Sequence, residues 1–284
     1  MPPGEVGAVN WRTQENLVEA FSGLGRLPDE KIDLAASALL VAAGEYTDLD
    51  IQRELGHLDG LASAAKRRLT GERDALADAN SLSRYLFDEV GFRGNRDAYY
   101  EPQNSYLNDV LARRLGLPLT LSLLYIEVGK RLGLGFEGVG MPGHYLVRHC
   151  EETRLCIDPF NGGVLLSEDE CAARLRETMG RTDLVWDPNY LRPIGNRDTL
   201  VRMLRNIKQA YLRLDDAMRM IRTIDYLLAL QPSLAEERRD RGLLRYRLGD
   251  HAAALDDLSA YLRDAPDNQD APAVANLVER MRRG

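Results

Sequence analysis

The chain's clearest capacity for chemistry lies in one histidine and one aspartate, His144 and Asp158. His144 follows a Pro-Gly turn and opens a segment that predicts a β-strand, residues 145–148, and Asp158 lies in a second such segment, residues 155–160. If these strands are antiparallel neighbours, the Asp158 carboxylate can fix one tautomer of the His144 imidazole, as in the base and orienting residue of a catalytic triad. The alternative is a buried histidine that caps the turn before it, because isolated His–Asp pairs also occur outside active sites.

The elements around this pair predict an α+β fold. The N-terminal region is helical, and it includes a segment, residues 32–41, that is apolar on nearly every side and is therefore expected to be a buried helix. A loop rich in aromatic and turn-forming residues, 91–108, leads to a helix that starts at Pro118. Short strands at residues 136–140, 145–148, 155–160 and 164–166 then predict a small antiparallel sheet.

The end of the chain returns to helical patterns and contains an internal repeat. Leu214, Asp216, Leu228 and Pro232 recur 34 residues later as Leu248, Asp250, Leu262 and Pro266. A period of about 34 residues with a closing proline is typical of tetratricopeptide helix hairpins, each of which buries its apolar face by stacking on a neighbour. The sequence therefore predicts helical repeats over residues 195–284, after a first domain at residues 1–186.

Composition argues against several classes of function. Lys and Arg total 37 against 44 Asp and Glu in 284 residues, so the formal net charge of -7 does not suit a general nucleic-acid binder. No apolar run approaches the ~20 residues of a membrane span, and three cysteines fit a reducing compartment. We therefore expect a cytoplasmic protein that binds neither nucleic acid nor membrane.

The motifs do not predict a cofactor or a metal. The chain has no glycine-rich phosphate loop, no Cys-x-x-Cys pair and no His-Glu-x-x-His helix. His144 and His149 would point to opposite faces of one strand, which does not suit a shared zinc ion.

A series of motifs, taken in order, closely resembles the bacterial SirB family. They are YLF at 85–87, GFRGN at 91–95, NSYLN at 104–108, RRLGLPLTLS at 113–122, PGHYLVR at 142–148 and IDPFNGG at 157–163. The resemblance runs from about residue 30 to the C-terminus. It implies a transglutaminase-like, papain-like core, in which the start of a helix faces a sheet carrying His144 and Asp158, followed by a tetratricopeptide segment.

The resemblance also implies a missing nucleophile. In active members of that superfamily the helix begins with Gly-x-Cys, and the thiolate attacks an amide carbonyl. The corresponding position in this chain is about Pro118 or Leu119, and no cysteine lies at this helix start. Thr120 and Ser122 are the candidate replacements, although a hydroxyl is harder to deprotonate than a thiol and one residue along a helix turns a side chain by about 100°.

Other polar side chains of these motifs are candidates for ligand binding in the cleft that the resemblance implies. They are Asn95, Tyr100, Asn104, Arg113, Arg148 and Asn161. Asparagines beside turns mostly satisfy backbone groups, whereas the two arginines suit the recognition of a carboxylate.

The missing cysteine and the repeats together predict a non-catalytic protein that binds a protein or peptide partner. The alternative is a hydrolase or acyltransferase acting on amide or ester bonds. In that enzyme Thr120 or Ser122 would be the nucleophile, His144 the base and Asp158 the orienting residue.

Overall fold

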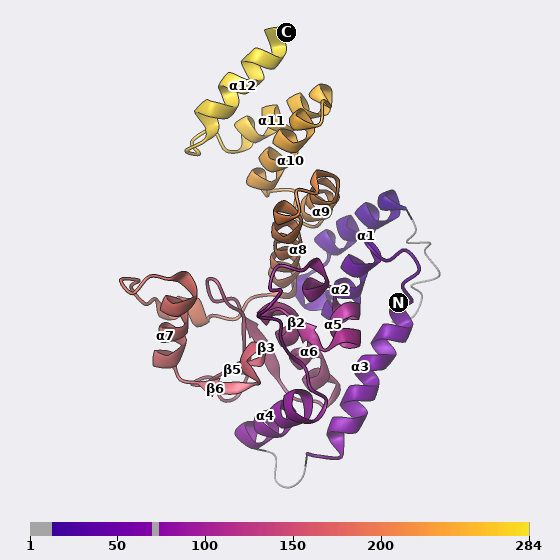
Figure 1. Cartoon of the computed structure of the whole chain (residues 1–284), viewed down its shortest axis with the longest axis vertical. Coiled ribbons are helices and arrows are strands. Elements are labelled where there is room, and N and C mark those ends of the chain that lie inside the picture. Colours follow the sequence, from indigo (N-terminus) through magenta and orange to yellow (C-terminus); the bar gives the residue numbers. More distant parts are fainter. Residues whose placement is uncertain (1–12, 70–73, 284) are drawn as a thin grey trace. The chain divides into compact units, whose positions relative to one another are not determined.

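Residues 13–69 and 74–283 are described by the computed structural model, and they fall into two units (Figure 1). The core unit is Pro28–Met203. The repeat unit joins the described residues up to Leu27 to the chain from Leu204 onward. The candidate residues for chemistry all lie in the core unit.

The core unit is mostly helical. Its α-helices are α2 (Leu34–Ala43), α3 (Ile51–Lys66), α4 (Ala75–Ser83), α5 (Leu107–Arg113), α6 (Pro118–Arg131) and α7 (Glu168–Met179). Asp33, Asp50 and Asp74 cap α2, α3 and α4, because each carboxylate accepts a hydrogen bond of 3.0–3.1 Å from the backbone N–H three residues later. All but one residue of α2 is buried, as its apolar sequence predicts. Among the helices that the structure describes, none has the length and apolar character needed to cross a membrane.

The strands form a small antiparallel sheet in chain order. They are β3 (Phe136–Val139), β4 (Leu146–His149), β5 (Cys156–Asp158) and β6 (Val164–Leu166). Val147 lies opposite Ile157 in the register of β4 and β5, so these two strands are direct neighbours. A separate parallel pair joins β1 (Arg93–Gly94) to β2 (Leu115–Gly116). Helices with a small antiparallel sheet confirm the predicted α+β fold.

The sheet packs on helices through large apolar side chains. The ring of Tyr125 on α6 meets that of Phe136 on β3 edge to face at 5.0 Å. Gly129 allows this approach, since a Cβ there would lie 2.4 Å from the Phe136 ring. Cys156 of β5 and Cys171 of α7 share a buried cluster that covers another part of the sheet. The sheet is thereby held against α6 on one side and α7 on another.

Helix α8 (Asn196–Arg213) begins at a cap from a distant part of the core unit. The Asp29 carboxylate accepts hydrogen bonds of 2.8 Å from the backbone N–H groups of both Asn196 and Arg197. Gly195 leaves room for it, because a Cβ there would lie 2.5 Å from Asp29 Oδ2. A carboxylate in this place satisfies two N–H groups of the first turn and complements the positive end of the helix.

We expect Asp29→Ala to lower the free energy of unfolding of the core unit by about 1–2 kcal/mol, as for the loss of a helix cap. Urea denaturation would measure the loss, and hydrogen exchange would show faster exchange in the first turn of α8. Asp48→Ala, at an exposed position without a described partner, is the control and should change neither. Equal losses in both variants would contradict the capping role.

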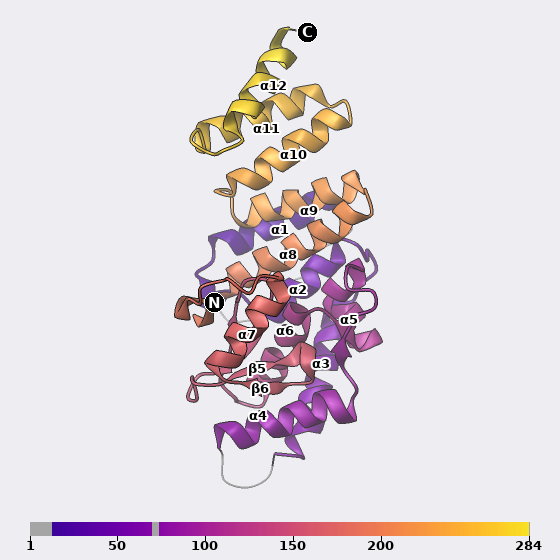
Figure 2. The same cartoon turned by 60° about the vertical axis from the view of Figure 1, so that its left-hand side comes forward.

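The repeat unit continues from α8 into a stack of hairpins (Figure 2). Its helices are α1 (Gln14–Arg26), α9 (Ala217–Leu230), α10 (Ala235–Arg247), α11 (His251–Asp264) and α12 (Ala271–Arg283), and α1 lies beside α9. The predicted boundaries, 1–186 and 195–284, place α1 with the core instead, and they stay a prediction.

The 34-residue period corresponds to equivalent turns in the repeat unit. Asp216 and Asp250 cap α9 and α11 in the same way, each accepting a hydrogen bond from the backbone N–H three residues later. The residues just before them, Asp215 and Gly249, both have positive φ, at 53° and 86°. The sequence repeat is therefore a repeat of helix ends and turns.

Candidate functional site

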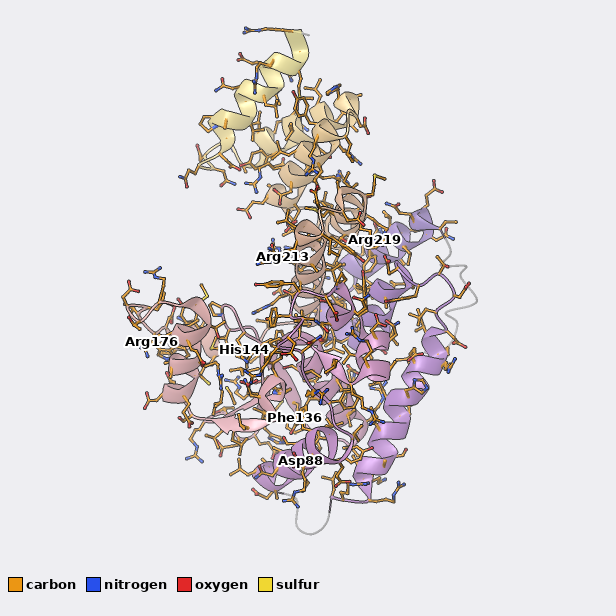
Figure 3. All side chains as sticks on the ribbon, in the orientation of Figure 1. Asp88, Phe136, His144, Arg176, Arg213 and Arg219 are labelled. Carbon is orange, nitrogen blue, oxygen red and sulfur yellow. The ribbon has the colours of Figure 1, made fainter. Side chains whose placement is uncertain are left out.

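His144 and Asp158 meet at one end of the sheet. His144 (labelled in Figure 3) lies two residues before the start of β4, with its backbone N–H bonded to the carbonyl of Met141. Asp158 ends β5. His144 Nε2 lies 3.0 Å from Asp158 Oδ1, although the ring N–H is not aligned well enough to count as a hydrogen bond. Only 5% of His144 and none of Asp158 is exposed. The pair is thus a buried imidazole–carboxylate contact.

Asp158 has further partners. Its carboxylate accepts a hydrogen bond of 2.6 Å from the Asn161 side chain and one of 3.3 Å from the Asn161 backbone N–H. The Nε of Arg174, on α7, lies 3.7 Å away. Burial raises the pKa of Asp158, but the close contact with His144, with Asn161 and Arg174, outweighs burial and holds this pKa below its usual value. Asp158 is therefore a charged centre that several elements share.

The two candidate nucleophiles are both bonded to the backbone. Thr120 Oγ1 accepts a hydrogen bond of 2.9 Å from the Leu117 N–H and donates one of 2.7 Å to the Asn104 carbonyl, so it caps the start of α6. Ser122 Oγ donates to the Tyr145 carbonyl at 3.3 Å. Both side chains are buried, and in the described structure neither hydroxyl forms a hydrogen bond with His144. Pro118 is the first residue of α6.

The candidate ligand residues before α6 form an internal network. Asn95 donates a 3.0 Å hydrogen bond to Asn104 and accepts one from the Ala98 N–H. Asn104 in turn donates to the carbonyls of Ala98 and Tyr99, which closes the loop on itself. Arg113 pairs with Glu101 at 2.5 Å.

Two further candidates are Tyr100 and Arg148. Tyr100 is 47% exposed and packs edge to face on Tyr99. Arg148 pairs with Glu137 across β3 and β4 at 2.6 Å and donates to the Leu191 carbonyl. The structure therefore joins Asn161 to the His144–Asp158 pair. Both candidate arginines, Arg113 and Arg148, instead form ion pairs with glutamates of the same chain. As candidate ligand-binding residues they stay a prediction.

A pocket of about 580 Å³ opens beside the pair. It is lined by Arg93, Gly94, Asn95, Arg96, Asp97, Leu115, Phe160 and Asn161. The Phe160 ring is held on one side by His144, edge to face at 6.1 Å, and has the Arg96 guanidinium 5.5 Å from its centroid. Arg96 also donates a hydrogen bond to Asn161 Oδ1. Phe160 and Asn161 thus stand between the buried pair and the pocket.

Sequence reasoning did not single out Arg93, Arg96, Phe160 or Arg174. Arg93 and Phe160 lie inside the motifs at 91–95 and 157–163, so the motif boundaries were a signal. Arg96 lies one residue beyond its motif, and Arg174 reaches Asp158 from a helix sixteen positions later (174 minus 158) with no local pattern to mark it. In the described part of the chain no three His, Cys, Asp or Glu side chains gather as metal ligands.

Comparison with known proteins agrees with this architecture. A family described as "Transglutaminase-like superfamily" matches residues 52–205, and one described as "Tetratricopeptide repeat" matches residues 207–279. A "UPF0162 protein" of Xylella fastidiosa is 38% identical over 274 residues, which cover 94% of this chain and 96% of that protein.

Other relatives have a lower sequence identity, and one of them is matched over only part of its length. A "UPF0162 protein" of Vibrio cholerae is 28% identical over 89% of this chain and 93% of its own. Human "F-box only protein 21" is 30% identical over 182 residues, which are 60% of this chain and 28% of that protein. The SirB family name suggested by the motifs stays a prediction. The chain therefore belongs to the transglutaminase-like superfamily and to the UPF0162 family.

Proposed function

We propose that this protein is a non-catalytic, transglutaminase-like protein that binds a protein or peptide partner. The hydroxyls of Thr120 and Ser122 are bonded to backbone groups, which supports the absence of a nucleophile. The burial of His144 and Asp158 supports a structural role for the pair. Tetratricopeptide hairpins supply the binding surface, since such repeats commonly present one.

The observation that carries partner binding is an exposed apolar patch on the repeat unit. Leu214, Met218 and Leu248 are 48–68% exposed. Leu214 and Leu248 are equivalent in the 34-residue repeat, and the ion pair of 2.8 Å between Asp215 and Arg247 places their turns next to each other. Apolar side chains that gather on a surface mark interaction sites more often than single ones do.

We expect Leu214→Ser with Leu248→Ser to reduce capture of the partner at least about tenfold, about 1.4 kcal/mol of binding free energy. Co-purification with the full-length wild type would identify the partner, and quantitative mass spectrometry would compare the variants. The matched control is the double variant Val185→Ser with Met179→Ser, at two exposed apolar positions of the core unit. This control should capture the partner as well as the wild type does. Recovery of the same proteins with both double variants would contradict the proposed surface.

The His144–Asp158 distance of 3.0 Å favours one second candidate, a hydrolase or acyltransferase on amide or ester bonds. A broad activity-based probe for serine and cysteine hydrolases separates the two. The proposal of a non-catalytic protein requires that the wild type is not labelled. Labelling that His144→Ala abolishes, and that Thr120→Ala or Ser122→Ala also removes, would establish the enzyme instead.

The proposed setting is the cytoplasm. The three cysteines, Cys150, Cys156 and Cys171, are unpaired, which supports a reducing compartment. The net charge of -7 supports a partner other than nucleic acid.

A further inference from the structure

We propose that the pocket beside Phe160 binds a carboxylate carried on an apolar body, such as the C-terminal residue of a peptide. This inference goes beyond the proposed function, because it assigns a ligand to the core unit and does not depend on the repeat unit. It stands on the charges, the unused hydrogen-bond donors and the volume of the pocket.

The charge of the pocket is positive. Arg93 and Arg96 line it, and Asp97 is the single carboxylate among the lining residues. No described ion pair joins Asp97 to either arginine, in contrast to Arg113 and Arg148, whose carboxylate partners come from the chain. The two exposed guanidinium groups are thus left available to an anion from solution.

The hydrogen-bond donors are held in place. A guanidinium has five N–H donors, and Arg96 is described as giving one of its groups, Nη2, to Asn161 Oδ1. The central carbon of the Arg96 guanidinium lies over the Phe160 ring, 5.5 Å from the ring centroid. The guanidinium is thus oriented both by this ring and by its hydrogen bond to Asn161. A preoriented guanidinium suits bidentate recognition of a carboxylate.

The remaining lining accounts for the apolar part of the ligand. Leu115 and Phe160 contribute apolar side chains, while the amide groups of Asn95 and Asn161 are bonded within the chain. About 580 Å³ is far more than a simple ion needs and lies within the range of small-ligand pockets. A ligand with a carboxylate and an apolar or aromatic body fits this pocket, because the carboxylate can meet the two arginines and the body can meet Leu115 and Phe160.

The test uses the full-length protein and two pairs of probes. One pair is N-acetylphenylalanine and its amide, and the other is acetyl-Gly-Gly-Phe with a free or an amidated C-terminus. Calorimetry, with NMR of the arginine Nε–Hε signals, should give a Kd at least about tenfold lower for each acid than for its amide. A lower Kd for the tripeptide acid than for the amino acid points to a peptide end as the ligand, and equal values point to a small free acid. Equal affinity of acids and amides would overturn the proposal.

Variants locate the binding. Arg93→Gln and Arg96→Gln should each raise the Kd for the acid about tenfold, and both positions are exposed, so the fold should be retained. Arg84→Gln, an exposed arginine of the same unit that does not line the pocket, is the matched control and should leave the Kd unchanged. Asn161→Ala should weaken binding in the wild type but add nothing in Arg96→Gln, because it acts by orienting Arg96. Unchanged binding in both pocket variants would overturn the assignment.

Discussion

Replacing Asp158 by alanine is expected to destabilise the core unit by about 3–5 kcal/mol, the usual loss when one partner of a buried charged pair is removed. Asp158 has no exposed surface, and its carboxylate contacts His144, Asn161 and Arg174. The variant leaves the buried His144 and the partly buried Asn161 and Arg174 without this acceptor, and it adds a small cavity. Hydrogen exchange measured by mass spectrometry over β4 and β5 would report the loss for this unit separately.

Asp183→Ala is the matched control for this prediction. Asp183 also pairs with an arginine of the core unit, but both side chains are well exposed, so stability should hardly change. Asp158→Ala without loss of stability would contradict a structural pair. It would instead match a site that retains strain for catalysis, where removing a charged group often stabilises the protein.

The pH dependence of stability follows from the lowered pKa of Asp158. Since this pKa is lower in the folded chain than the value of about 3.9 in the unfolded chain, the charged carboxylate contributes stability at pH values above the unfolded pKa. That contribution is lost as the pH falls through the folded pKa. The difference in the free energy of unfolding between the wild type and Asp158→Asn should therefore decrease as the pH falls below about 4.

The sequence predicted that His144 and Asp158 lie close together, because the strands that carry them follow each other closely in the chain. Alternating apolar residues and the turns between them indicated the sheet, and antiparallel strands in chain order bring residues 144 and 158 together. The same reasoning found the repeat, since turns that recur every 34 residues leave equal spacings of Asp216 and Asp250. In both cases the determining contacts are local.

The contents of the site were harder to predict because they depend on side-chain direction in loops. The motif around Thr120 suggested a hydroxyl at a helix start, but the bond to the Asn104 carbonyl joins residues sixteen positions apart. Arg96 and Phe160 meet across a much longer gap of 64 positions (160 minus 96), where neither spacing nor composition marks a contact. A polar residue in a motif therefore predicted a location better than it predicted a role.

Replacing Phe21 by alanine is expected to destabilise the repeat unit by about 3–5 kcal/mol. The Phe21 ring is fully buried and stacks on Tyr226 of α9 at 4.8 Å. Nearby, Gly25 brings α1 close to the α9 backbone, since a Cβ there would lie 2.5 Å from the Leu230 carbonyl oxygen. Helix α1 is thus joined to the repeat unit by a large apolar contact.

Hydrogen exchange distinguishes this arrangement from the boundaries predicted from the sequence. In full-length Phe21→Ala, protection should fall in α9 and its neighbours and stay unchanged in the β4–β5 peptides of the core unit. Glu19→Ala, on the exposed side of the same helix, should change neither. The sequence predicted a helical N-terminal region but not the element that α1 packs on, because an apolar stripe on a helix fits any apolar surface. Loss of protection in the core unit alone would return α1 to a domain of residues 1–186.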